Sequence, residues 1–386
     1  MKRFYSPLFL IGFTCSLSLA AGADESWIPL FNQHDLAGWT GVHEVQFDVR
    51  DSNLHLIEGM GWLRTDQRYD DFILEFECKP LVENYDSGVF IRAGLEGKPW
   101  PDTGFQINLK QDAWGTLVRG YRPMIKSEVE GPAVGEWAAF RIEAKGEEAV
   151  LFINGEKVWE ADFIEPEEGY IGIQTENRAF EFRNIRVQEL GYTNLLEKEE
   201  EGFRFLKVHA GPQDAWQLTE DVVLICSGAA GGWIGTTTPD YGDFNLKLDF
   251  LVPQEGNSGV FIRHPGQGDG AYTGMEIQIL DDDATHWGPL QPWQKTGSVY
   301  HEIAPSERAT KEAGTWQTMQ IIADGARLTI YVNGTPIVDA DLDEEKYAKS
   351  TTEAAGLKLR PRSGYIGFQN YDGDIQYRNV RVKHLR

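Results

Sequence analysis

One segment of the sequence, 273–283, combines a strand pattern with side chains that could perform acid/base chemistry. Apolar residues alternate with Glu276 and Gln278, the period-two pattern of a strand with one apolar and one polar face. A bulge near Leu280 would return Asp281 to the polar face, because a bulge adds one residue. Two carboxyls on one sheet face suit glycosidic chemistry, in which one group donates a proton and another accepts one. The alternative is a half-solvated strand followed by an acidic turn.

Tyr300 and His301, at the end of a later strand pattern, are further candidates for proton transfer. The unperturbed pKa of imidazole, about 6.5, lies close to physiological pH. A histidine at a strand end can instead be a surface or hydrogen-bonding residue. Arg263 alternates off the apolar face of its segment, so it could either bind ligand oxygens or hold a neighbouring carboxylate. We expect substrate contacts from five residues: Asn257, Arg263, Gln278, Trp287 and Gln369.

The acidic segment 281–286 could also ligate Ca²⁺ or another divalent ion. Its spacing matches neither an EF-hand nor a zinc pattern. We therefore expect no metal and no other cofactor, with a divalent ion as the alternative.

The chain is long enough for two domains, because it has 386 residues and a domain typically takes roughly 150. Residues 1–23 resemble a secretory signal, with Lys2 and Arg3, an apolar run and a small-residue cleavage site. These features predict an exported protein, periplasmic or extracellular. No later segment is apolar over the roughly 18 residues that a membrane span needs. The net charge of −24 argues against nucleic acid as a partner.

Two cysteines, Cys78 and Cys226, follow the signal region, and they fall in different halves of the chain. Cys78 continues an alternating apolar pattern, so a buried free thiol is predicted for it. A disulfide framework is not supported by two such distant cysteines.

The mature chain is a tandem repeat of one unit rich in short alternating strands. Matching motifs in the two halves are Gly61-Trp-Leu and Gly232-Trp-Ile, Asp86-Ser-Gly-Val-Phe-Ile-Arg92 and Asn257-Ser-Gly-Val-Phe-Ile-Arg263, and Gly169-Tyr-Ile-Gly-Ile-Gln174 and Gly364-Tyr-Ile-Gly-Phe-Gln369. An Asn-Gly pair between alternating strands, Asn154-Gly155 and Asn333-Gly334, predicts a two-residue hairpin in each copy.

Many short strands without helical periodicity predict an all-β protein of two tandem antiparallel jelly-roll sandwiches. We place the first domain at 24–190, a charged linker at 191–206 and the second domain at 207–386. An insertion before Arg362 in the second copy could form a loop over the site or a solvated surface loop.

The two copies differ where chemistry is predicted. Gln106 aligns with Glu276 and Asn108 with Gln278, and Gln111 aligns with Asp281, so the first copy carries amides along the whole pattern. An amide can hydrogen-bond a sugar hydroxyl but cannot exchange a proton near neutral pH. If this pattern is catalytic, the second copy is the active one.

As a set, these motifs resemble the 3-keto-disaccharide (3-keto-glycoside) hydrolase domain family, whose fold is a concanavalin A-like jelly roll. The resemblance rests on Leu30-Phe-Asn-Gln-His-Asp-Leu-Ala-Gly-Trp39, the repeated motifs above, Glu276-Ile-Gln-Ile-Leu-Asp281, Thr296-Gly-Ser-Val-Tyr300 and Tyr377-Arg-Asn379. The two copies span nearly the whole mature chain.

The resemblance implies an enzyme that acts on a sugar carrying a ketone at C3. Such a ketone acidifies the C2 hydrogen, so that a base removes it, the glycosidic oxygen leaves with a proton and water then adds. We expect Glu276 as base or acid, with Asp281, Tyr300 or His301 as its partner, and Arg263 and Gln278 among the groups that orient the sugar.

Two other functions remain open from the sequence. One is a noncatalytic carbohydrate-binding or adhesion protein, for which the amides of the first copy are suited. The other is a conventional glycoside hydrolase with Glu276 and Asp281 as its carboxylate pair.

Overall fold

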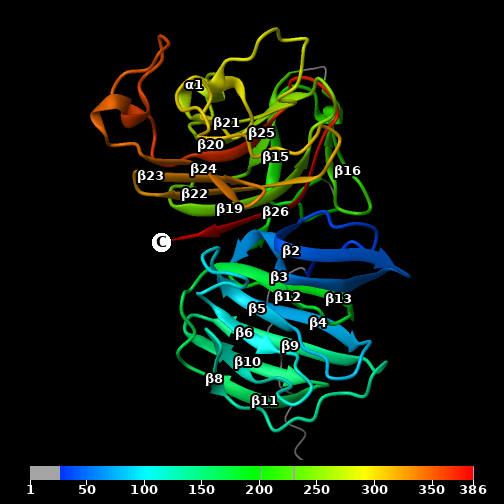
Figure 1. Cartoon of the computed structure of the whole chain (residues 1–386). Coiled ribbons are helices and arrows are strands. Elements are labelled where there is room, and N and C mark those ends of the chain that lie inside the picture. Colours follow the sequence, from blue (N-terminus) through cyan, green and yellow to red (C-terminus); the bar gives the residue numbers. More distant parts are fainter. Residues whose placement is uncertain (1–26, 201, 229–230, 386) are drawn as a thin grey trace, which may run out of the picture.

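The computed structural model describes residues 27–200, 202–228 and 231–385. They form two β domains that follow one another in sequence and stack in space (Figure 1). The prediction of two tandem all-β jelly-roll sandwiches is confirmed. The predicted signal peptide lies outside the described residues.

The strands of the first domain hydrogen-bond into one continuous sheet that folds around a core. They are β1 (Ile28–Pro29), β2 (Trp39–Arg50), β3 (Asn53–Tyr69), β4 (Phe72–Pro80), β5 (Gly88–Ala93), β6 (Phe105–Asn108), β7 (Leu117–Arg119), β8 (Arg122–Ile125), β9 (Ala138–Lys145), β10 (Glu148–Ile153), β11 (Glu156–Ala161), β12 (Gly169–Glu176) and β13 (Phe180–Glu189). The sheet is continuous because the long β3 pairs with β13 near its start and with β12 near its end.

The second domain has two separate sheets. Its strands are β14 (Thr193–Asn194), β15 (Leu206–Ala210), β16 (Trp216–Leu218), β17 (Leu224–Cys226), β18 (Trp233–Thr236), β19 (Phe244–Leu251), β20 (Asn257–His264), β21 (Met275–Leu280), β22 (Gln317–Asp324), β23 (Arg327–Val332), β24 (Thr335–Asp341), β25 (Tyr365–Gln369) and β26 (Ile375–His384). Its helical elements are α1 (Gly270–Thr273) and the short 3₁₀ turns Gln213–Ala215, Pro292–Gln294, Glu345–Tyr347 and Leu357–Leu359.

The larger sheet has the order β16-β17-β26-β19-β22-β23-β24, with β14 beside β26, and the smaller one has the order β15-β18-β25-β20-β21. The sheets separate where the chain passes from β17 to β18. Gly228, Gly231 and Gly232 all have positive φ there, which glycine adopts readily and which a strand does not allow.

Both predicted hairpins are confirmed. Asn154 and Gly155 join β10 to β11, and Asn333 and Gly334 join β23 to β24. All four residues have positive φ, as a type I′ turn requires.

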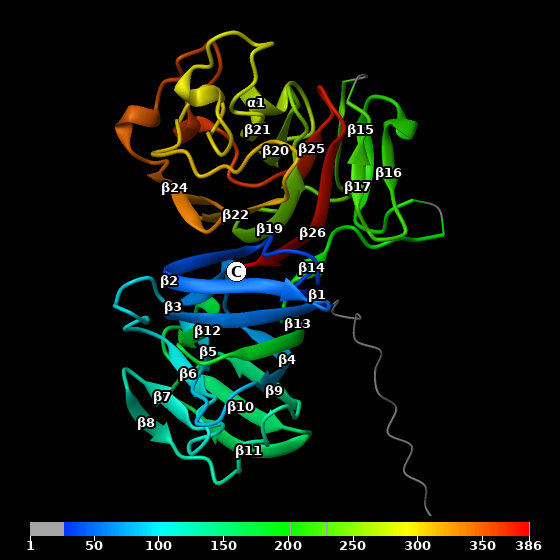
Figure 2. The same cartoon turned by 45° about the vertical axis from the view of Figure 1, so that its right-hand side comes forward.

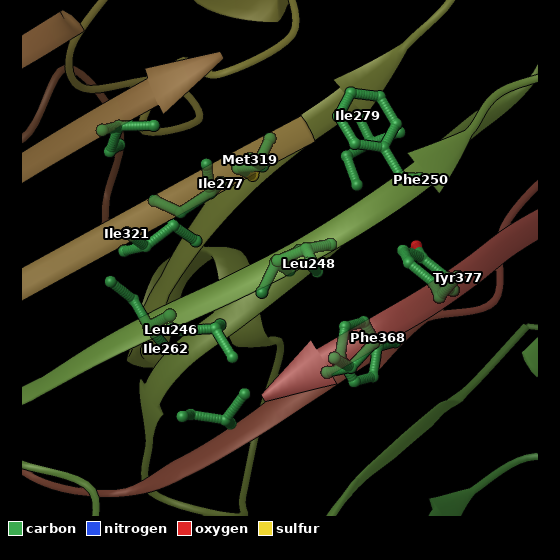
Figure 3. Packing of buried hydrophobic residues seen from close by; sticks show 14 of the residues in the cluster. Leu246, Leu248, Phe250, Ile262, Ile277, Ile279, Met319, Ile321, Phe368 and Tyr377 are labelled. Carbon is green, nitrogen blue, oxygen red and sulfur yellow. The ribbon is translucent and has the colours of Figure 1, made fainter. Parts of the chain in front are cut away.

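Each domain has its own apolar core, and Figure 3 shows part of the second one, between the two sheets. Met275, Ile277 and Ile279 are fully buried in it, as the alternation predicted, and they face residues such as Met319 and Ile321 of β22. The polar side chains of β21 therefore lie on the opposite face of the smaller sheet. Cys78 is a buried free thiol, as its alternating pattern predicted, and Cys226 is a buried free thiol as well.

The predicted linker, 191–206, is instead built into the second domain. β14 pairs with β26, and Leu195, Leu196 and Leu206 are buried in the second core. The apolar residues interspersed in this charged segment are large enough to fill space beside β26. The segment was predicted to be a linker because its charged residues dominate its composition.

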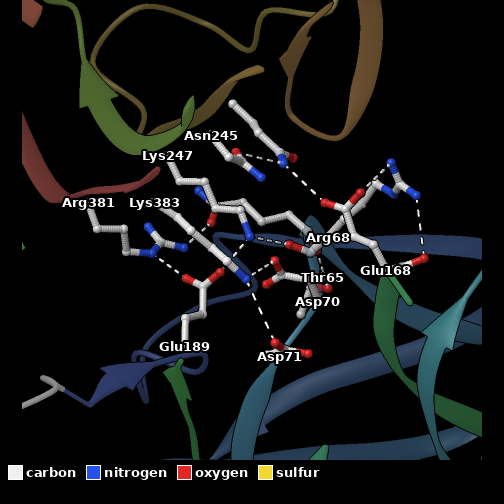
Figure 4. Close-up of polar contacts among 12 residues, drawn as sticks. Thr65, Arg68, Asp70, Asp71, Glu168, Glu189, Asn245, Lys247, Arg381 and Lys383 are labelled. Carbon is white, nitrogen blue, oxygen red and sulfur yellow. Dashed lines mark hydrogen bonds and ion pairs between the residues drawn. The ribbon is translucent and has the colours of Figure 1, made fainter. Parts of the chain in front are cut away.

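The outer face of the larger sheet rests on the first domain, and the contact contains buried charges (Figure 4). The Lys247 ammonium on β19 donates to the Glu189 carboxylate over 2.5 Å, and Arg381 on β26 donates to the other oxygen of the same carboxylate. All three side chains are almost fully buried. Lys383 adds an ion pair with Asp70 at 2.8 Å.

We expect Glu189→Gln to lower the free energy of unfolding by about 3–5 kcal/mol, because it leaves two buried cations without their carboxylate. Urea unfolding of the whole chain measures the change. Asp339→Asn, which removes one member of an exposed pair with Arg327, is the matched control and should leave the midpoint nearly unchanged. Equal midpoints for both variants would show that the buried pair does not hold the domains together.

Candidate active site

The candidate site lies on the polar face of the smaller sheet of the second domain, on the side away from the first domain. Figures 1 and 2 show α1 and β21 at this far side, while β19 and β26 face the first domain. The floor of the site comes from alternate residues of four strands. They are Trp233 of β18, Phe261 of β20, Glu276 and Gln278 of β21, and Gln369 of β25.

Glu276 is the central titratable group of this face. Only 3% of the residue is exposed. Its side chain extends over the neighbouring strand, where Gly259 leaves room for it: a Cβ at that position would lie 2.1 Å from the Glu276 carboxylate. Burial raises the pKa of Glu276 to about 8, and the negative charge of Asp269 adds to the increase. Glu276 is thus mostly protonated at neutral pH.

Two tyrosines adjoin this carboxyl. Tyr300 lies in a turn whose backbone N–H donates to the Glu276 carbonyl at 2.9 Å, and Tyr272 comes from α1. Burial, followed by the charge of Glu276, raises the pKa of Tyr300 to about 12. Burial also raises the pKa of Tyr272, with contributions from Asp269 and Glu276. Both hydroxyls therefore stay protonated and can donate hydrogen bonds at neutral pH.

His301 lies next to this group. Its ring stacks on Trp293 with 3.7 Å between centroids, and its centroid lies 5.9 Å from that of Tyr272. Partial burial lowers the pKa of His301, which keeps the imidazole neutral and able to accept a proton at neutral pH. The structure thus brings together three of the four predicted catalytic residues, Glu276, Tyr300 and His301.

Asp281 lies elsewhere than predicted. β21 pairs with β20 in continuous register from Met275 to Leu280, so the predicted bulge near Leu280 is absent from this pairing. The Asp281 carboxylate instead accepts the backbone N–H groups of Glu255 and Asp283, at 3.0 and 3.1 Å. This residue closes the turn after β21 and connects it to the loop before β20.

The irregularity lies in β20, at Arg263. The register of β20 against β25 shifts between Phe261 and His264, and Arg263 has a φ of 50°. Its fully buried guanidinium donates to the Gly242 and Gly325 carbonyls, each at 2.9 Å, and pairs with Asp243 at 3.4 Å. Of its two sequence-based interpretations, the structure therefore shows the one in which the arginine holds a carboxylate.

The remaining predicted contacts surround the floor. Gln278 donates weakly to Asn257 Oδ1, at 3.4 Å, and both side chains belong to adjacent strands. Trp287 packs against Tyr371, with 5.8 Å between centroids, and its indole N–H has no partner among the described residues. Gln369 is half-buried at the end of β25. Gln278 and the indole nitrogen of Trp287 are buried, whereas Asn257 and Gln369 are half-buried.

Sequence reasoning missed an aromatic stack on the same face of the smaller sheet. The Trp233 indole lies between two imidazoles, with centroids 4.0 Å from His209 and 4.6 Å from His264. Burial lowers the pKa of His264 to about 4, and its Nε2 has no partner among the described residues. One difference between the two copies could have indicated this stack: Ala93 of the first copy aligns with His264 of the second.

The acidic segment after β21 is engaged with the protein itself. Asp282 accepts the backbone N–H of Thr296 at 2.9 Å, and Asp283 forms a bidentate pair with Arg308. Within the described ranges, no three His, Cys, Asp or Glu side chains gather in a metal-binding group.

The insertion before Arg362 packs against the wall of the site. Arg360 is buried and donates to the carbonyls of Ala271 and Gly274 at the ends of α1, and to Glu302. Thr351 donates to the His301 carbonyl at 2.8 Å. The insertion thereby fixes the two segments that carry Tyr272 and His301.

The chain belongs to the family of 3-keto-alpha-glucoside-1,2-lyase-like domains. The sequence model of this family matches residues 26–188 and 191–383, one segment in each structural domain. Membership of this family supports a carbohydrate-active protein of the glycosidase type. No curated protein sequence matches the chain.

Several solved structures are similar to part of the chain. Two proteins from Parabacteroides distasonis, described as proposed glycosyl hydrolases, are 25% and 26% identical over 50% and 51% of this chain and 99% and 94% of their own, with TM-scores of 0.44 and 0.45. A carbohydrate-binding module from Bacillus subtilis is 15% identical over 40% of this chain and 96% of its own, with a TM-score of 0.35. In the part of the chain that the structure describes, no helix is long and apolar enough to cross a membrane.

The raised pKa of Glu276 predicts a pH-dependent stability. Between the ordinary carboxyl pKa of 4.5 and about 8, the folded state keeps a proton that the unfolded state has released, so wild-type stability falls as pH rises. Glu276→Gln removes this dependence. Relative to the difference between the two proteins at pH 4, its free energy of unfolding should exceed that of the wild type by a few kcal/mol above pH 8.

Urea unfolding at a series of pH values measures this difference. Glu255→Gln is the control, because backbone N–H groups of His286 and Thr285 lower the pKa of Glu255 and its removal gives no alkaline gain. Parallel pH curves for wild type and Glu276→Gln would contradict the raised pKa.

Proposed function

We propose that the second domain cleaves 3-keto-glycosides by elimination followed by hydration, with Glu276 as the general acid. One observation carries this proposal: the carboxyl of Glu276 is buried on the polar sheet face and holds its proton at neutral pH. Its charge acts on Tyr272 and Tyr300, and the neutral imidazole of His301 lies next to these two tyrosines. A raised carboxyl pKa in such surroundings is typical of an acid catalyst. The predicted signal sequence further supports an exported enzyme.

The reaction begins with removal of the C2 proton, which the C3 ketone makes acidic. His301 accepts this proton, and the electron pair forms an enolate whose negative oxygen is stabilised by the Tyr300 and Tyr272 hydroxyls. The C1–O1 bond then breaks, the C1–C2 double bond forms and the ketone is restored. Glu276 donates its proton to the departing O1.

Hydration completes the cycle. Water adds its hydroxide to C1 and a proton returns to C2 from His301, while the remaining water proton restores Glu276. The net reaction is hydrolysis, and no cofactor is consumed. Gln278 and Asn257 are suited to orient hydroxyls, because an amide both donates and accepts hydrogen bonds.

The conventional glycosidase alternative has less support. It needs Asp281 as a second carboxylate opposite Glu276, but the oxygens of Asp281 are engaged by the backbone N–H groups of Glu255 and Asp283. A retaining pair must lie about 5–5.5 Å apart with both groups open to the sugar.

We expect Glu276→Gln to lower the turnover of a 3-keto-disaccharide by at least about 100-fold, because the amide cannot protonate O1. For the wild type, kcat/KM should fall as pH rises through about 8, where Glu276 loses its proton. Release of the monosaccharide, assayed in parallel with the unoxidised disaccharide, measures both effects.

Gln106→Ala, at the aligned position of the first domain, is the matched control and should keep wild-type turnover. An unchanged rate for Glu276→Gln, or a rate that rises across pH 8, would exclude Glu276 as the acid.

We expect His301→Gln to reduce kcat by about 100-fold and to abolish the fall in rate on the acidic side of the profile. That fall should lie below pH 6.5, because partial burial lowers the imidazole pKa. His34→Gln, at an exposed position of the first domain, is the control. If the rate of His301→Gln still falls at acidic pH, the base is another residue.

A further inference from the structure

The first domain has a groove on the face that corresponds to the candidate site of the second domain. Its volume is about 320 Å³, and its walls come from β5, β6, β7, β12 and the loops between them. Gln106 occupies the place of Glu276 and extends over Gly88 as Glu276 extends over Gly259: a Cβ on Gly88 would lie 2.1 Å from the Gln106 amide. The groove thus shares this arrangement with the candidate site, while its central group is an amide, which does not titrate.

The floor of the groove is a fixed row of amides. Gln106 Nε2 donates to Gln174 Oε1 at 2.5 Å, and Gln174 Nε2 donates to Glu176 at 3.1 Å. Asn108 Oδ1 accepts the Lys110 backbone N–H at 2.9 Å. Among the described residues, this leaves Gln106 Oε1 without a donor and the Asn108 amide N–H₂ without an acceptor. One free acceptor and one free donor, two residues apart on the same face of β6, suit a pair of sugar hydroxyls.

Two aromatic rings form the rim. Trp100 and Tyr121 lie 5.7 Å apart between centroids, and the Trp100 indole donates to the Thr175 carbonyl at 3.3 Å. Tyr121 is 67% exposed, more than any other large hydrophobic residue in the described part of the first domain. A fixed indole beside an exposed phenol ring offers a platform for the apolar face of a pyranose ring.

The charges of the groove favour a neutral ligand. Lys110 lies 3.5 Å from Asp86, which offsets its charge, and Glu176 is also in the wall. These side chains leave no unpaired cation for an acidic sugar, and the two carboxylates would repel one.

We propose that the groove lined by Trp100, Gln106, Asn108 and Tyr121 is a second saccharide-binding site, which holds a neutral pyranose of an oligosaccharide and does not cleave it. The site is separate from that of the proposed reaction, so its existence does not depend on the chemistry of Glu276.

Titration calorimetry of the full mature chain with maltose and with cellobiose tests the proposal, and a glucuronate disaccharide provides the acidic comparison. Tyr121→Ala should weaken binding of the neutral sugar about tenfold, because it removes half of the stacking platform. Gln106→Leu should weaken it by a similar factor. Leu359→Ala, an equally exposed apolar residue of the second domain, is the matched control and should bind as wild type does.

The turnover of a 3-keto-disaccharide is measured on the same preparations. Tyr121→Ala and Gln106→Leu should keep this turnover, which also shows that both variants are folded. Absence of neutral-sugar binding to the wild type, binding that neither variant weakens, or tighter binding of the acidic sugar would each overturn the proposal. If the wild type shows Tyr121-dependent binding of the neutral sugar but does not turn over the 3-keto-disaccharide, only the proposed function is overturned.

Discussion

The buried carboxylate of Glu189 is the constraint on which the arrangement of the two domains depends. It lies at the end of the last strand of the first domain and accepts from Lys247 and Arg381 of the second, in a region from which solvent is excluded. Removing such charges from water costs several kcal/mol per ion, and only their mutual contact offsets that cost. These contacts therefore stabilise the relative position of the two domains seen in the structure.

This docking decides which sheet face of the second domain stays open. The outer face of the larger sheet, with Lys247, Gln320 and Arg381, is covered by the first domain. The polar face of the smaller sheet lies on the opposite side, and the first domain does not cover it. A face with Glu276 buried but unpaired is costly, and buried groups with perturbed pKa values are concentrated at functional sites. The two buried carboxyls are thus neutralised in different ways: Glu189 by two cations, and Glu276 by its own proton.

Much of the fold could be predicted from local pattern, and several features of the site could not. Alternation placed Met275, Ile277 and Ile279 in the core, and each Asn-Gly pair gave a hairpin, because these properties depend on neighbours in sequence. The position of the bulge depends on the partner strand, and it fell at Arg263 rather than near Leu280. The role of Arg263 followed from that shift, since a positive φ turned its side chain into the protein.

The two copies of the unit share the space for a central polar group and differ in the group that fills it. Gly88 and Gly259 occupy equivalent positions and each gives room to the side chain from the neighbouring strand, so both copies retain the space that a central polar group needs. In the first copy that group is held by hydrogen bonds to other amides, whereas in the second it is a carboxyl surrounded by tyrosines and a histidine. The two copies thus share the space around the central group and differ in its chemistry, because an amide cannot exchange a proton near neutral pH and a carboxylic acid can.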